Sequence, residues 1–354
     1  MPTFYPGPSK VYPQVPHYVQ EAYDAGVLSI NHRSPEFVEL SARAIRLVKD
    51  RLRVPEDYTV FYVSSATECW EIISQSLVQQ ASYHVYNGAF GEKWYHYAQR
   101  LQPHAERYAF DRQHPLALDG VQPSQDVEVL CLTHNETSNG TALANATLST
   151  VRTQFTNVLI AVDATSSLAG VALPIDQADV WYASVQKCFG LPAGMAVMIC
   201  SPRALAKAQQ VGERNHYNSL LSMQEKMHDW QTTHTPNVLA IYLLMRTLEA
   251  RESIEEVDRQ TQRRYSEWID FLTKHPTLHL LITDPAVRSQ TVIPIESDVD
   301  TIDRLRNQAK AAGITLGNGY GDLKPTTLRI ANFPAIGDHE IDQLREFLNR
   351  ISAE

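Results

Sequence analysis

The sequence predicts an α/β protein with a mostly parallel sheet flanked by helices and a smaller C-terminal α+β domain. Through the first two thirds of the chain, short apolar, β-branched segments alternate with helix-like segments. This alternation is typical of parallel sheets covered on both faces. After residue 250 the pattern changes to a long helical stretch up to about residue 275 and a few strands. We therefore expect a large domain at residues 16–245 and a small domain made of residues 1–15 plus 246–354.

The expected elements follow in chain order. The stretch "FYPGPSKVYPQVP" is rich in proline and glycine, which favours an extended arm. Residues 34–54 have apolar positions at helical spacing, with Ser34 as the N-cap and Pro35 at the first helical position. In the large domain we expect strands at 58–63, 83–87, 127–134, 158–165, 179–185 and 195–200, and helices at 68–78 and 92–101. In the small domain, after helical residues to about 275, we expect strands at 278–282, 290–295 and 326–332 and helices near 300–312 and 338–350.

Composition excludes several classes of function. The chain has 354 residues and a formal net charge of −9, with 44% apolar and 20% charged residues. Binding to nucleic acid or to an anionic membrane surface needs a basic face, so we expect neither partner. The 13 histidines show no H-x-x-x-H spacing on a predicted helix, so we expect no metal site. Neither G-x-G-x-x-G nor a P-loop follows a predicted strand, which disfavours nucleotide binding.

Cysteine usage and the absence of long apolar runs predict a soluble, cytoplasmic protein. The four cysteines form no C-x-x-C pair, which is typical of buried thiols in a reducing compartment. The segment "MPTFYPGPSK" has neither the basic start nor the apolar run of a signal peptide. The apolar run "VLAIYLLM" is too short to span a bilayer.

Small, aromatic and polar residues follow the predicted strands, where parallel sheets bind their ligands. "SSATECW" begins a helix and so offers backbone amides to an anion. Phe90, Thr137, Asp163 and Lys187 come after the next strands in turn. Each alone has an ordinary structural explanation, as a core aromatic, a turn residue, a cap or a surface lysine. Their shared position at one edge of the sheet favours a common ligand.

One cofactor would use all of these groups. Pyridoxal phosphate has an aldehyde for Lys187, a phosphate for the helix start, a phenolic oxygen for Thr137, a ring nitrogen for Asp163 and a flat face for Phe90. Gln186 beside the lysine adds a hydrogen-bond donor for the phosphate. A covalent bond between Lys187 and the aldehyde would also remove the cost of burying a charged amine.

These segments, in this order, resemble the class V aminotransferases of fold type I, and among them the phosphoserine aminotransferases, over nearly the whole chain. The motifs are "FYPGPSKV", "NHRSPEF", "SSAT", "NGAFG", "HNETSNG", "VDATSS", "SVQKCFGLPAG", "HTPNV" and "TLRIAN". The resemblance implies the fold of pyridoxal-phosphate transferases of type I, with residues 16–245 as the cofactor domain. It also implies that Lys187 carries the cofactor and that Asp163 binds the ring nitrogen, both as catalytic residues.

The resemblance further implies the other site residues. The implied cofactor-binding residues are Ala66, Thr67, Phe90, Thr137, Asp163, Gln186, Lys187, His234 and Thr235. Of these, His234 and Thr235 match residues that reach the phosphate from a neighbouring subunit, which implies a homodimer with shared active sites. Arg329 matches the arginine that binds the substrate α-carboxylate. His32 and Arg33 match a pair that binds the substrate phosphate, again from the other subunit.

The implied reaction converts 3-phosphohydroxypyruvate and glutamate to phosphoserine and 2-oxoglutarate in serine biosynthesis. The chain departs from the pattern at three places: "SSAT" is not glycine-rich, His234 stands for an asparagine, and the segment before Arg329 lacks a His-Arg pair. Lys324 and Tyr320 are candidates to replace that pair.

Two alternatives stay open at this point. The first is another class V aminotransferase, such as an alanine/serine–glyoxylate aminotransferase, whose substrates lack a distal anion. The second is a non-catalytic protein that binds pyridoxal phosphate. A desulfurase is disfavoured because no cysteine follows Lys187 on a flexible, glycine-rich loop.

Overall fold

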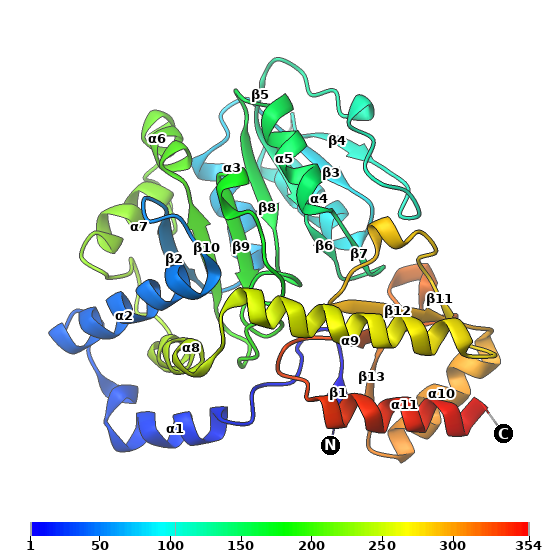
Figure 1. The fold of residues 1–354 in the computed structure, drawn as a ribbon. Helices are drawn as coiled ribbons and strands as arrows, with labels where there is room; N and C mark the ends of the chain where they lie inside the picture. The colour runs from blue at the N-terminus through cyan, green and yellow to red at the C-terminus, as the bar shows by residue number, and fades with distance from the viewer. Residues whose placement is uncertain (1, 103, 353–354) are drawn as a thin grey trace.

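The computed structural model describes residues 2–102 and 104–352, which form two main sheets surrounded by helices (Figure 1). The large sheet has the strand order β2-β10-β9-β8-β5-β3-β4 and the small one the order β1-β13-β14-β12-β11. The large sheet is built from β2 (Thr59–Val63), β3 (Ala81–Tyr86), β4 (Glu106–Ala109), β5 (Val127–Thr133), β8 (Leu159–Asp163), β9 (Val180–Ser184) and β10 (Ala196–Cys200). The small sheet is built from β1 (Thr3–Phe4), β11 (His279–Leu280), β12 (Val292–Glu296), β13 (Thr315–Asn318) and β14 (Thr327–Ala331). The strands β6 (Asn135–Glu136) and β7 (Thr141–Ala142) form a separate hairpin.

The centre of the large sheet is parallel, and this brings strand ends together. Strands β4, β3, β5, β8 and β9 pair in parallel, whereas β10 pairs antiparallel with both β9 and β2. The register places Thr133 beside Asp163, and Asp163 beside Tyr182. The carboxyl ends of β5, β8 and β9 therefore lie side by side at one edge.

Helices flank both sheets (Figure 1). They are α1 (Val15–Asp24), α2 (Pro35–Leu52), α3 (Ala66–Ser76), α4 (Ala89–Leu101), α5 (Asn145–Gln154), α6 (Pro202–Val211), α7 (Leu220–Met227), α8 (Val238–Ala250), α9 (Ile254–Lys274), α10 (Val299–Ala311) and α11 (Asp338–Ser352). Figure 1 shows α9 running from the side of the large sheet to the small sheet, where Arg264 pairs with Asp338 of α11 at 2.6 Å. In the described residues, no helix has the length and apolar character needed to cross a membrane.

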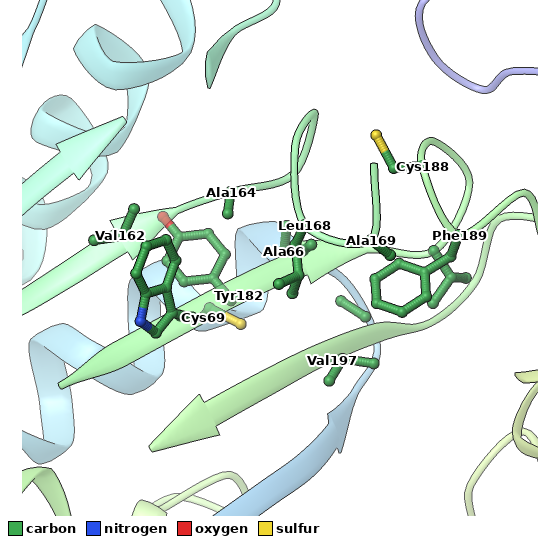
Figure 2. Packing of buried hydrophobic residues seen from close by; sticks show 14 of the residues in the cluster. Ala66, Cys69, Val162, Ala164, Leu168, Ala169, Tyr182, Cys188, Phe189 and Val197 are labelled. Carbon is green, nitrogen blue, oxygen red and sulfur yellow. The ribbon is translucent and has the colours of Figure 1, made fainter. Parts of the chain in front are cut away.

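One continuous apolar core supports the large sheet. Cys69 of α3, Val162 of β8 and Val197 of β10 belong to the same buried cluster, and Figure 2 shows them close together. Tyr182 and Phe189 of the same cluster are also buried. This core holds the starts of α3 and α4 against the sheet, so the residues that follow each strand have fixed positions.

Most of the expected elements are present, and the differences have local causes. The expected N-cap is confirmed, because the Ser34 side chain accepts a hydrogen bond from the Phe37 amide at 3.4 Å. The arm is extended as expected but ends earlier, since α1 begins at Val15 with a proline in its first turn, where a proline is tolerated. The long helical stretch expected up to about residue 275 is confirmed as α9, which is separated from α8 by the extended backbone of Arg251.

The break between α8 and α9 had a recognisable signal. The Ser253 side chain caps α9 by accepting from the Glu256 amide at 3.4 Å, and serine followed three residues later by glutamate is typical of a helix start. The strands β1, β4, β6, β7 and β13 were not expected, because all are short and lack a clear apolar alternation. The division into domains at residues 16–245 stays a prediction.

Candidate active site

A cavity of about 400 Å³ lies at the carboxyl edge of the large sheet. Its lining comes from the N-terminal arm, the starts of α3 and α4, the ends of β5, β8 and β9, and the small sheet. The expected site residues that line it are Ala66, Thr67, Phe90, Thr137, Asp163, Gln186, Lys187 and Arg329. The structure thus brings together residues from segments that are up to 263 positions apart in the sequence.

Lys187 is buried, with 7% of its surface exposed. Its Nζ donates to Thr137 Oγ1 and to Ser166 Oγ, both at 3.0 Å, and lies 5.3 Å from the centre of the Phe90 ring. Burial lowers the pKa of Lys187 to about 8, although the Asp163 charge opposes this shift. The neutral amine, which is the nucleophilic form, is therefore well populated at mildly alkaline pH.

Asp163 ends β8 and is also buried. Burial raises the pKa of its carboxyl, while hydrogen bonds from Thr165 and Tyr182 and the charge of Lys187 oppose the rise. The Thr165 amide donates to Asp163 Oδ1 at 2.9 Å, and the Tyr182 hydroxyl itself accepts from Trp70 Nε1 at 2.9 Å. The carboxylate is thus held in one orientation within the cavity wall.

The start of α3 lies at the cavity. Ser65 caps the helix by accepting from the Glu68 amide at 3.1 Å, and the Ala66 amide donates to Ser184 Oγ at 3.0 Å. Thr67 lies in the first turn and lines the cavity. The first amides of a helix have no partner within the helix and carry partial positive charge, which suits a phosphate.

The Phe90 ring is placed by a residue that the sequence did not single out. Glu136 is 1% exposed, and its carboxylate accepts from the amides of Phe90 and Gly91, each at 3.1 Å. It also accepts from the Ser138 amide at 2.9 Å and from Ser138 Oγ at 2.6 Å. The buried Glu136 carboxylate therefore caps the start of α4 and fixes the position of Phe90 relative to Lys187.

Arg329 of β14 reaches the cavity from the small sheet. Its Nε donates to the Asn318 carbonyl at 2.7 Å and its Nη1 to the Thr137 carbonyl at 2.8 Å. The residue is 6% exposed, and burial lowers the pKa of the guanidinium. Two carbonyls hold this planar cation at the wall, which suits a carboxylate ligand.

The N-terminal arm closes one side of the cavity. Tyr5 through Pro8 line it, and the Ser9 amide donates to the Gln186 carbonyl at 2.9 Å. Gly7 has a φ of +150°, and a Cβ built on it would lie 2.8 Å from Lys187 Cε. Only glycine fits this contact, which explains a glycine in the proline-rich arm.

Four expected site residues lie outside this cavity. Arg33 Nη1 donates to Gln231 Oε1 at 2.7 Å, and His234 packs edge-on against Tyr217 with ring centres 5.7 Å apart. Burial and the nearby Arg33 and His234 lower the pKa of His32. The structure thus gathers His32, Arg33 and His234 in a second cluster, while Thr235 is exposed nearby.

Of the two candidates for the missing His-Arg pair, only Tyr320 lines the cavity. Lys324 is exposed and follows the short helix Gly321–Leu323, and its backbone carbonyl accepts from Arg306 Nη2 at 3.0 Å. Further lining residues that sequence analysis did not identify are Trp70, Lys93, Tyr97, Thr165 and Ser184. Their positions had no local signal, because each depends on how distant segments pack.

The groups in the cavity fit pyridoxal phosphate. A buried lysine amine, a buried carboxylate, an aromatic ring and a helix start each suit a different part of that molecule. Lys187 makes hydrogen bonds to two hydroxyl groups, which leaves its amine free to bond to an aldehyde carbon. By contrast, the described residues hold no group of three or more His, Cys, Asp or Glu side chains arranged to bind a metal ion.

Fold and cavity together define a pyridoxal-phosphate-dependent transferase of fold type I, and comparisons with known proteins name the family. The family model described as aminotransferase class V matches residues 4–325, so the chain belongs to the class V aminotransferases. It is a transaminase that uses pyridoxal phosphate as its cofactor. The family resemblance and the fold class expected from the sequence are thereby confirmed.

Individual relatives span the whole chain. A phosphoserine aminotransferase of Rhodococcus opacus is 28% identical over 367 residues, which covers 98% of this chain and 94% of the relative. The crystal structure of a phosphoserine aminotransferase from Cytophaga hutchinsonii is 32% identical with a TM-score of 0.93, covering 99% of this chain and 98% of that one. An alanine–glyoxylate aminotransferase from Nostoc sp. has a TM-score of 0.86 at 21% identity, covering 99% of this chain and 94% of that one. At that identity the likeness concerns the fold.

Proposed function

We propose that this transaminase acts on substrates with a second acidic group, and that it exchanges the amino group between glutamate and 3-phosphohydroxypyruvate to form phosphoserine in serine biosynthesis. The observation that supports this proposal most is the charge of the cavity. Among the described residues that line it, Lys93, Lys187 and Arg329 are cationic, whereas Asp163 is the single carboxylate. Glutamate and phosphoserine both carry an anion at each end, so a cationic cavity suits both.

The names of similar proteins support the same substrate. The Rhodococcus and Cytophaga relatives, at 28% and 32% identity, are both called phosphoserine aminotransferases. The alternative, an alanine/serine–glyoxylate aminotransferase, would have the same fold. It predicts a cavity with fewer cations, because its substrates lack a distal anion.

We assign the chemical roles as follows. Pyridoxal phosphate, when bound, supplies an aldehyde for the substrate amine and a ring that withdraws electrons from the α-carbon. The Lys187 amine moves the proton at the α-carbon, and Asp163 keeps the ring nitrogen protonated as a neighbouring anion. Phe90 covers the ring face, and Thr137 binds the phenolic oxygen.

The remaining roles concern the cofactor phosphate and the substrate carboxylate. Ala66, Thr67 and Gln186 bind the cofactor phosphate at the start of α3. Arg329 binds the substrate α-carboxylate, because its planar guanidinium matches two carboxylate oxygens. Both assignments agree with the positions of these residues at the cavity wall.

We also propose a homodimer in which the cluster of His32, Arg33, His234 and Thr235 completes the cavity of the partner subunit. The four residues do not line the cavity of their own chain, which supports a role in another one. Mixing the variants Lys187→Ala and Arg33→Ala tests the proposal. In each mixed dimer one shared site keeps both residues, so about a quarter of the wild-type activity returns. If the mixture stays as inactive as its components, the sites are not shared.

A panel of keto acids tests the substrate. We load the enzyme with the amine form of the cofactor and follow its return to the aldehyde form by absorbance. We expect 3-phosphohydroxypyruvate and 2-oxoglutarate to react much faster than glyoxylate or pyruvate. Faster reaction with glyoxylate or pyruvate would support the alternative aminotransferases instead. No reaction with any keto acid would support a non-catalytic protein that binds the cofactor.

Two further expectations remain proposals. The four cysteines are free and buried, which supports a reducing compartment such as the cytoplasm. The division into a cofactor domain at 16–245 and a small domain at 1–15 plus 246–354 agrees with β1 joining the small sheet. Limited proteolysis that cuts near residue 245 and leaves the two parts associated would test this division.

A further inference from the structure

We propose that Lys93, together with Tyr320, binds the distal anion of the substrate and makes this transaminase selective for acidic substrates. This assignment rests on the proposed function. It gives Lys93 and Tyr320 the role of the missing His-Arg pair. It concerns this chain's own residues, in addition to the pair expected from the partner subunit.

The cavity has one cation more than the shared chemistry of transaminases requires. Lys187 bonds to the cofactor, and Arg329 is held by the carbonyls of Asn318 and Thr137 in a position suited to the α-carboxylate. Lys93 is the cation that remains among the described lining residues. A substrate with a single carboxylate offers Lys93 no ionic partner, whereas a substrate with a second anion offers one.

The position of Lys93 follows from the start of α4. Lys93 comes three residues after Phe90, so both side chains lie on the same face of the helix. Its Nζ is 5.5 Å from the centre of the Phe90 ring and 5.0 Å from the centre of the Tyr320 ring. The Phe90 ring, which also lies 5.3 Å from Lys187 Nζ, therefore has both amines around it.

Tyr320 connects the two cations. Lys93 Nζ donates to the Tyr320 hydroxyl, and the Tyr320 ring lies 5.6 Å from the Arg329 guanidinium. Lys93, Tyr320 and Arg329 therefore form a row along the cavity wall. A substrate whose α-carboxylate binds Arg329 has its distal end directed toward the other two residues.

The row ends at the mouth of the cavity. Lys93 and Tyr320 also line an open groove of about 700 Å³ outside it, whose lining includes His96 and Arg112 as well as Glu92 and Asp322. The distal group of a substrate is the part closest to the mouth, because its amine and carboxylate face Lys187 and Arg329. An ammonium at this position meets the distal anion before the substrate is fully enclosed.

Lys93 has no competing ionic partner. Within residues 2–102 and 104–352 it forms no ion pair, and its hydrogen bond is to the hydroxyl of Tyr320. The Lys93 side chain is exposed, so its ammonium is accessible to a ligand that enters the cavity. Lys324, the other candidate, lies outside the cavity lining.

The test compares acidic and neutral amino acids on the holoenzyme. We measure kcat/KM of the half-reaction for phosphoserine, glutamate and alanine, with Lys93→Met, Lys93→Arg and the control variant Lys324→Met. For Lys93→Met we expect kcat/KM with phosphoserine and glutamate to fall roughly 10- to 100-fold relative to alanine, as for a lost hydrogen bond between charged groups. Lys93→Arg keeps the cation and should restore most of the preference, and Lys324→Met should leave it unchanged.

A binding measurement separates recognition from turnover. Glutarate carries two carboxylates but no amine, and butyrate carries one, so neither reacts. We expect Lys93→Met to weaken glutarate binding by the same factor and to leave butyrate binding unchanged. A smaller loss is expected for Tyr320→Phe, which keeps the ring and removes the hydroxyl.

The outcomes distinguish this inference from the proposed function. An equal loss for all three amino acids in Lys93→Met, or an unchanged preference for the acidic ones, overturns the role of Lys93. If the wild type prefers glutamate to alanine but does not use phosphoserine, the phosphoserine proposal fails. Loss of the glutamate preference in Lys93→Met then still supports the role of Lys93 in distal-anion binding.

Discussion

Replacing Lys187 with methionine in the cofactor-free protein measures the cost of burying its charge. Burial lowers the pKa of Lys187 from 10.5 to about 8. One pKa unit corresponds to about 1.36 kcal/mol. The pKa shift of Lys187 therefore means that the charged lysine lowers the unfolding free energy by about 3 kcal/mol relative to the neutral lysine. Methionine is similar in length and has no charge, so it leaves the packing of the cavity wall largely intact.

The sign follows from proton binding in the two states. Below pH 8 both folded and unfolded chains hold the proton, and the folded state bears the full cost of the buried charge. Between pH 8 and 10.5 the unfolded chain still binds the proton and the folded chain has lost it, so stability rises with pH in this window. Above pH 10.5 both states are neutral and the contribution has disappeared.

Urea unfolding of both apoproteins across this pH range is the assay. We expect Lys187→Met to be more stable than wild type below pH 8. This difference in unfolding free energy should shrink by about 3 kcal/mol between pH 8 and 10.5, as the wild-type lysine becomes neutral. A Thr156→Val control changes an exposed residue and should follow the wild-type profile. If the difference between Lys187→Met and wild type does not change with pH, the lysine is not buried as a charge and the reasoning is refuted.

The other predictions concern residues around Lys187 and one distant control. Glu136→Ala removes the acceptor of the Phe90 amide, so we expect about 2–4 kcal/mol lower stability in urea unfolding, and an unchanged midpoint would contradict the role of this cap. Gly7→Ala places a methyl group 2.8 Å from Lys187 Cε, and we expect at least a tenfold slower uptake of cofactor by the apoenzyme, followed by absorbance. Cofactor uptake at the wild-type rate would show that the N-terminal arm moves to accommodate the methyl group. Ser253→Ala removes the cap of α9 and should cost about 1 kcal/mol without changing kcat, so a change in kcat would link this helix to the site.

The strands of the large sheet could be predicted because their signal is local. Apolar, β-branched runs such as the one ending at Asp163 show where a buried strand lies, and the next residues then belong to the carboxyl edge. For this reason Phe90, Thr137, Asp163 and Lys187 could be placed together before their distances were known. The short strands β4 and β13 escaped prediction, since each pairs with a partner that the local pattern does not reveal.

Contacts between distant segments could not be predicted in this way. Glu136 looks like one polar residue among several in its loop, yet burial makes it the acceptor for the start of α4. Lys93 and Tyr320 lie 227 positions apart, and neither has a spacing that relates it to the other. The candidate Lys324 was as plausible in sequence as Tyr320, and the fold excludes it from the cavity lining.

The sequence by itself determined most strands of the large sheet, the residues at the strand ends and the family resemblance, because these depend on periodicity and on residues that are close in the chain. The tertiary structure alone decided which cations share a cavity, how deeply Lys187 is buried and which expected residues lie elsewhere. The physical reason is that pKa shifts and binding geometry depend on solvent exclusion and distance. Both are set by packing between segments that the sequence keeps far apart.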